Sequence, residues 1–133
     1  MTDLSRWGVF LPSYIWAGDG PDRARGIKEF SRAVEDLGFD SLFVTDHLIA
    51  AKRFYSVSFL EPLTALAVAA GATSRVRLGT SILIMPLRHP VMLAKELATL
   101  QFLSENRVIL GAGVGWNEFE YAALGVKKSE RGK

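Results

Sequence analysis

The stretch from Val76 to Leu103 most constrains the fold, because it contains one complete strand, loop and helix. Its first part, Val76–Ile84, is aliphatic and β-branched, as expected of a parallel strand buried on both faces. Gly79–Thr80–Ser81 interrupts that run and predicts a backbone distortion near its C-terminal end. Pro86 then ends the strand, and Pro90 suits the first position of the following helix. The stretch therefore predicts a β–loop–α unit.

The remainder of the chain shows the same alternation. Further strands are predicted at Trp7–Leu11, Ser41–Val44 and Arg107–Gly111, and further helices at Asp22–Leu37, Pro62–Ala72 and Asn117–Leu124. Four strands alternating with helices predict a parallel α/β fold in one domain, residues 1–133. The pattern alone leaves the choice between an open sheet and a (β/α)₈ barrel.

Two helices carry patterns that predict their surroundings. Ile27, Phe30, Val34 and Leu37 share one face of the first helix, which should therefore cover the sheet. The helix at Pro62–Ala72 has almost no polar face, so it should lie between other elements or in a subunit interface.

Composition narrows the functional classes. The 133 residues carry a formal charge of +2 without a clustered basic face, which argues against nucleic-acid binding. The longest apolar run is too short to cross a bilayer, and metal-ligand spacings are absent. No cysteine occurs and the N-terminus does not resemble a signal peptide, so we expect a cytoplasmic protein.

In a parallel α/β fold, reactive groups gather at the C-terminal ends of the strands. These ends supply Thr45–His47, Thr80–Ile82 and Gly111–Trp116. The imidazole of His47 suits proton transfer near neutral pH, with Asp46 beside it. The alternative interpretation is that Asp46 caps a turn and His47 is a satisfied polar group at the rim.

Three other features have both a functional and a structural interpretation. The glycine-rich run Gly111–Gly115 could bring backbone N–H groups to a flat or anionic ligand, or could reflect close packing. Arg88 and His89 could bind an anion, but a helix cap is the simpler interpretation for His89. Glu61 is interpreted as a helix-start carboxylate rather than a general base.

The ordered series TDHL, EPLTALAVAAGATSRVRLGTSIL, RHPVMLAKELATL and NRVILGAGVGW, closed by EFEYAALG, resembles the N-terminal half of the luciferase-like monooxygenase superfamily. More narrowly, it is similar to the branch that uses the deazaflavin F420, with FMN as the alternative cofactor. The resemblance implies a (β/α)₈ barrel, of which this chain supplies about the first four units. It also implies oxidoreduction of a small organic substrate, by hydride transfer or monooxygenation.

The resemblance also implies roles for individual residues. His47 matches the family's acid or base beside the cofactor ring, accompanied by Asp46. Thr80, Ser81 and Ile82 match a bulge at which a non-proline cis peptide often supports the ring. Gly111, Gly113 and Gly115 match the loop along which the ring lies. Trp116 departs from the family's sugar-phosphate dehydrogenases, which carry an acid near that point, so their activity is not implied here.

The length of the chain affects both function and assembly. A full barrel needs roughly 200 residues and usually takes its phosphate site from its last two units. We therefore expect this chain to form a homo-oligomer or to belong to a longer protein. The alternative function is a non-catalytic remnant that serves as a cofactor-binding or assembly module.

Overall fold

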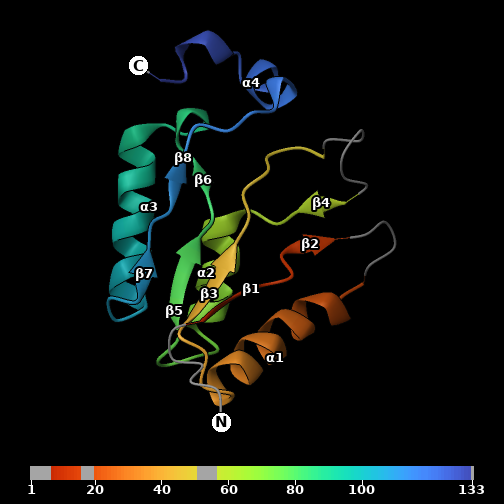
Figure 1. Cartoon of the computed structure of the whole chain (residues 1–133), viewed down its shortest axis with the longest axis vertical. Coiled ribbons are helices and arrows are strands. Elements are labelled where there is room, and N and C mark those ends of the chain that lie inside the picture. The colour runs from red at the N-terminus through yellow and green to blue at the C-terminus, as the bar shows by residue number, and fades with distance from the viewer. Residues whose placement is uncertain (1–6, 16–19, 51–56, 133) are drawn as a thin grey trace.

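The computed structural model of the chain describes residues 7–15, 20–50 and 57–132 (Figure 1). Its longer helices are α1 (Asp22–Asp36), α2 (Pro62–Ala70) and α3 (Pro90–Leu103), followed by the short helix α4 (Glu118–Ala123). Its strands are β1 (Gly8–Phe10), β2 (Tyr14–Ile15), β3 (Ser41–Val44), β4 (Ser58–Phe59), β5 (Arg77–Thr80), β6 (Leu83–Ile84), β7 (Val108–Ile109) and β8 (Ala112–Gly113). Two 3₁₀ turns, η1 (Met85–Leu87) and η2 (Lys128–Glu130), complete the elements. None of the described helices has the length and hydrophobicity that a bilayer span requires.

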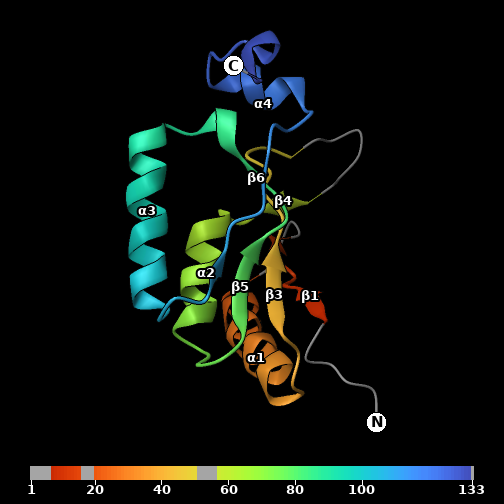
Figure 2. The same ribbon diagram turned by 60° about the vertical axis from the view of Figure 1, so that its left-hand side comes forward.

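The main sheet has four parallel strands in the order β1-β3-β5-β7. Its register pairs Val9 with Leu42, Leu42 with Leu78 and Leu78 with Val108. Figure 2 shows that α1, α2 and α3 lie on one side of this sheet, and that no helix of the described residues lies on the other. The predicted α/β fold built on a parallel sheet is therefore confirmed, and its one-sided helical layer is the arrangement of a partial barrel.

Two short strand pairs beside the main sheet were not predicted from the sequence. β2 and β4 pair in the antiparallel sense, so the expectation of only parallel strands is wrong at this point. β6 and β8 pair in the parallel sense beyond the ends of β5 and β7. Each of these strands is two residues long, which is too short for a period-two pattern to be recognised. The segment between β3 and α2 contains β4, and its residues 51–56 lie outside the described part of the chain.

The first helix buries the predicted face only in part. Ile27 and Val34 are buried and Phe30 packs against the core, but Leu37 is exposed. Leu37 lies at the C-terminal cap, after which Gly38 takes a positive φ of 84° and turns the chain away from the helix. The apolar stripe therefore ends one turn earlier than its sequence spacing predicts.

The second helix lies between α1 and α3, as its lack of a polar face predicted. Six of its nine residues are buried, including Leu66 and Ala69 with no exposed surface. Pro62 occupies its first position, and the side chain of Glu61 accepts a hydrogen bond from the Thr64 N–H at 2.7 Å. The helix-start interpretation of Glu61 is thus confirmed.

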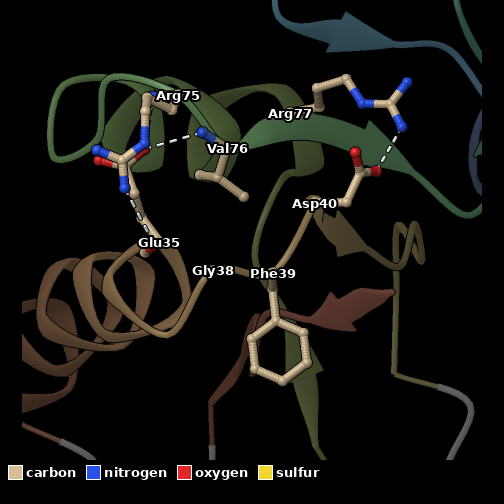
Figure 3. Close-up of a pocket in the computed structure, with 7 residues that line it drawn as sticks. All are labelled: Glu35, Gly38, Phe39, Asp40, Arg75, Val76 and Arg77. Carbon is tan, nitrogen blue, oxygen red and sulfur yellow. Dashed lines mark hydrogen bonds and ion pairs between the residues drawn. The ribbon is translucent and has the colours of Figure 1, made fainter. Parts of the chain in front are cut away.

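Polar contacts join α1 to the sheet at the N-terminal ends of the strands (Figure 3). The Glu35 carboxylate accepts N–H bonds from Ser74, Arg75 and Val76 at 2.5–3.0 Å. Partial burial raises the pKa of Glu35, but these hydrogen bonds outweigh that effect and lower the pKa to about 2. An ion pair between Asp40 and Arg77 lies on the other side of the same pocket of about 320 Å³.

Candidate functional site

The predicted site residues meet at the C-terminal ends of the strands, where α4 lies beyond the sheet (Figure 1). His47 follows β3 and lies against two aromatic rings. Its ring centroid is 5.0 Å from that of Phe59 and 5.9 Å from that of Trp116, which meets it edge-on. These rings help to bury the imidazole, and only 9% of the residue is exposed. The access of water to it is therefore limited.

Glu120 of α4 binds the imidazole directly. His47 Nδ1 lies 3.1 Å from Glu120 Oε1, and the backbone N–H of Leu48 donates to the same oxygen at 2.8 Å. Since the Leu48 N–H can only donate, Oε1 is an acceptor, and His47 Nδ1 therefore carries the proton of this bond. The hydrogen bond to Glu120 therefore uses Nδ1 of the imidazole and not Nε2.

The sequence determines where Glu120 lies through the start of α4. Asn117 caps the helix by accepting the Phe119 N–H at 3.1 Å, as its residue type predicted. Tyr121 is almost fully buried, and its hydroxyl donates to the Val114 carbonyl. These two contacts fix the backbone on both sides of Glu120, so that its side chain points inward and the residue is 1% exposed. Within the described residues its Oε2 has no hydrogen-bond partner.

Asp46 lies, as expected, at the C-terminal ends of the strands, a region that we call the mouth. Its two carboxylate oxygens are bound by other groups. Oδ2 accepts the Ile84 N–H at 2.8 Å, and Arg88 approaches both oxygens at 3.1 Å. Arg88 also contacts Glu61 at 2.9 Å, so one guanidinium joins the end of β3 to the start of α2. Burial raises the pKa of Glu61, but the bonds from Thr64 and Arg88 outweigh it and leave this pKa below its ordinary value.

These contacts favour one interpretation of the basic pair after β6. Arg88 is committed to two carboxylates rather than to an anionic ligand. His89 occupies the N-cap position of α3, but its side chain makes no capping hydrogen bond. Pro90 is the first helical residue, as predicted. The prediction of His89 as a helix cap is therefore correct for its position in the chain. Its imidazole does not take part in the cap, because it makes no hydrogen bond to the helix backbone.

The interruption after β5 is the predicted one. The Ser81–Ile82 peptide bond is cis, and β6 begins immediately after it. Thr80 is buried, and its hydroxyl donates to the Gly111 carbonyl at 2.8 Å and accepts from the Gly111 N–H at 3.1 Å. Beyond this point the side chain of Ile82 is partly exposed at the mouth.

The glycine-rich run fits closely against residues 80–84. A Cβ at Gly111 would lie 2.1 Å from the Thr80 carbonyl oxygen, and one at Gly113 would lie 2.5 Å from Ile82 Cδ1. Gly115 has a φ of +69°, which few other residues adopt. Close packing, the structural interpretation of this run, therefore explains its glycines; their contact with a cofactor ring remains a prediction.

One side of the mouth combines exposed apolar side chains with a buried polar pair, and a flat, largely apolar ring requires both. Ile82, Val114 and Trp116 are exposed there beside the buried His47–Glu120 pair. Arg88, the arginine beside Asp46, is already paired with two carboxylates, Asp46 and Glu61. Within the same part of the chain, no group of three or more acidic, histidine or cysteine side chains could hold a metal ion.

A parallel sheet covered by helices on one side, with its polar groups at the C-terminal strand ends, defines part of an α/β barrel. The sequence matches the luciferase-like monooxygenase family over residues 5–133, and the chain belongs to that family. Relatives of the chain include an F420-dependent glucose-6-phosphate dehydrogenase and a 4-hydroxyprotoasukamycin monooxygenase.

Individual relatives are all longer than this chain. The F420-dependent glucose-6-phosphate dehydrogenase of Beutenbergia cavernae is 42% identical over 92 residues, which cover 68% of this chain and 27% of that enzyme. A crystal structure of a monooxygenase from Streptomyces bottropensis has 29% identity and a TM-score of 0.75, covering 95% of this chain and 38% of that one. The FMN complex of the oxygenating constituent of 3,6-diketocamphane monooxygenase from Pseudomonas putida has a TM-score of 0.76 at 20% identity, covering 92% and 33%. The chain thus spans about two fifths or less of the curated relatives' length.

Two functional candidates at the mouth were not assigned from the sequence. Glu120 was overlooked because a six-residue helix shows no useful periodicity, although the EFEY segment contains it. The link from Arg88 to Asp46 was overlooked because it joins residues 42 positions apart. The sequence offered one signal: neither Glu120 nor Arg88 has an obvious charge partner close to it in the chain.

Proposed function

We propose that this chain supplies the ring-binding part of an F420-dependent oxidoreductase of the luciferase-like class, with FMN as the alternative cofactor. The observation that carries the proposal is the buried His47–Glu120 pair at the end of β3. Trp116 lies edge-on to His47, and the side chains of Ile82 and Trp116 are both exposed, as a planar apolar ligand would require. When bound, such a cofactor supplies hydride transfer or oxygen activation.

The residues of this chain then have distinct roles. His47 Nε2 takes or gives a proton at the substrate, since Nδ1 is held by Glu120. Glu120 fixes the ring orientation of His47 and balances a positive charge on it. Asp46 acts indirectly. Its bonds to Ile84 and Arg88 hold β6 in place beside the cofactor ring.

The substitution His47→Ala tests this assignment, with His89→Ala as its control. Both imidazoles belong to the same chain, but His89 is exposed. The experiment measures cofactor binding and turnover separately. Loss of turnover with retained cofactor binding in His47→Ala alone supports the proposal. Equal turnover in both variants would refute the role of His47.

The second candidate function is a cofactor-binding or assembly module without catalysis. Two observations favour it: the chain spans a minority of its relatives' length, and Arg88 at the mouth is already neutralised. Such a module would bind the ring weakly and turn nothing over. Binding without turnover, in a preparation whose oligomeric state is known, would favour this candidate over the first.

A further inference from the structure

The four-stranded sheet has two open edges within the described residues. There, β1 pairs only with β3, and β7 pairs only with β5. Neither Gly8–Phe10 nor Val108–Ile109 contains a charged residue or a proline. Charged residues and prolines are two of the devices by which proteins protect sheet edges, and neither of these short edge strands carries them.

The backbone groups at the two edges are complementary in direction. On β1, the Trp7 carbonyl and the Leu11 N–H bond to the β3 side, so the alternate residues Gly8 and Phe10 direct their backbone groups outward. On β7, the Arg107 carbonyl bonds to the β5 side, so Val108 and Leu110 direct theirs outward. The Val108 N–H donates to the Gln101 side chain, and new pairing therefore begins at Leu110.

The face of the sheet opposite the helices carries an aromatic surface. The Phe43 ring lies so close over the neighbouring strands that a Cβ at Gly8 or Gly79 would approach it within 2.7 and 2.3 Å. Phe10 lies 6.3 Å from this ring, centroid to centroid, and is 57% exposed. Figure 2 shows none of the described helices on this side. In a closed barrel this face is the interior.

The exposed surface of the chain is large for its mass. The chain exposes 8464 Å². A compact monomer of 14.6 kDa is expected to expose about 6,900 Å². The excess of about 1,600 Å² exceeds the roughly 800 Å² that each partner buries in an ordinary stable interface. A second copy of the chain therefore has enough surface to cover.

We propose that two copies close a single eight-stranded barrel, related by a two-fold axis parallel to the strands. The rotation keeps all strands parallel and places β7 of each copy beside β1 of the other. Both open edges are then used, and the assembly closes at two copies with the eight strands of a (β/α)₈ barrel. The proposal rests on the sheet and does not depend on the proposed function.

Two other ways of pairing the copies explain less of the structure. Pairing β7 with β7 of a second copy would be antiparallel and would leave both β1 edges open. Association through α3, which exposes Phe102 and Leu103, would leave both edges and the Phe43 face open. Only the head-to-tail arrangement covers all three features.

Sedimentation of the purified chain at micromolar concentration tests the assembly. We expect a species of twice the 14.6 kDa chain mass. Phe10→Lys on β1 and Ile109→Glu on β7 place charges on the sheet face opposite the helices, one at each edge, and each variant alone should sediment as a monomer. Phe102→Lys is the control: it adds a charge to an exposed position on α3 and to neither edge strand, and should remain a dimer.

Mixing the two edge variants distinguishes the head-to-tail arrangement from the others. In a mixed pair, the lysine that Phe10→Lys introduces in one copy and the glutamate that Ile109→Glu introduces in the other lie on the same face of the sheet at one seam. These two charges share one seam and the second seam is unchanged, so the dimer should return. If an edge variant unfolds when it dissociates, mixing should restore a folded dimer, measured by circular dichroism. A wild-type monomer, or a dimer lost in Phe102→Lys but kept in both edge variants, would overturn the proposal.

Discussion

Glu120 Oε1 lies 3.1 Å from His47 Nδ1, although 73 residues separate the two in sequence. The contact joins the end of the second main-sheet strand to a short helix beyond the fourth, and both side chains are buried. A carboxylate in this position determines which imidazole nitrogen faces the mouth. The chemistry proposed for this chain therefore depends on a residue that is not part of the sheet.

The first prediction concerns His47 itself. In a form of the protein that turns over, His47→Ala should lower the rate by roughly 10²–10⁴-fold, as expected for loss of a general acid or base. His89→Ala should leave the rate unchanged, because that imidazole is exposed and makes no capping bond. Steady-state kinetics on both variants provides the comparison, with circular dichroism as the check on folding.

The second prediction concerns Glu120. If it acts only through His47, then Glu120→Gln should slow turnover in the wild-type background and have no further effect in His47→Ala. The four rates of this double-mutant cycle measure the coupling. An equal additional loss in the His47→Ala background would show that Glu120 acts independently.

The third prediction concerns the ion pair between Arg88 and Asp46. Arg88→Met removes a guanidinium whose side chain is 18% exposed and leaves the Asp46 carboxylate without its charge partner. We expect the free energy of unfolding to fall by about 2–4 kcal/mol. Arg25→Met breaks a pair on α1 in which Arg25 is 70% exposed, and it should cost less than about 0.5 kcal/mol. Similar urea midpoints for the two variants would contradict the assigned role of Arg88.

The fourth prediction concerns pH. The folded state lowers the pKa of Glu35 from 4.5 to about 2, so this carboxylate stabilises the fold above pH 4.5. The contribution should be lost as the pH falls from 4.5 towards 2. Because Glu35 is partly exposed, Glu35→Gln should cost only about 1 kcal/mol at neutral pH. Its difference from Glu29→Gln, on the exposed side of the same helix, should shrink on acidification, and a constant difference would refute the assignment.

The fifth prediction separates two glycines. Gly111→Ala places a Cβ 2.1 Å from a backbone oxygen that cannot move independently, so it should destabilise the chain by about 3 kcal/mol or more. Gly26→Ala lies in the middle of α1 with open space around it and should stabilise the chain by up to about 1 kcal/mol. Thermal unfolding of the two variants should therefore shift in opposite directions.

The sequence was most informative where one element determines its own structure. The helix starts at Pro62, Pro90 and Asn117 and the strand interruption after Gly79–Thr80–Ser81 were predicted locally and are confirmed. Contacts between distant segments were not predictable. Glu120 reaches His47 only because Tyr121 and Asn117 anchor α4, and strands of two residues such as β2 carry no period.

The central claim is that the mouth of this chain binds a deazaflavin or flavin ring. An absorbance titration of the purified chain with F420 and, in parallel, with FMN tests it directly. The account predicts a saturable change in the spectrum of one cofactor, weakened in Trp116→Ala and retained in His89→Ala. No spectral change with either cofactor, from a folded chain of known oligomeric state, would contradict it.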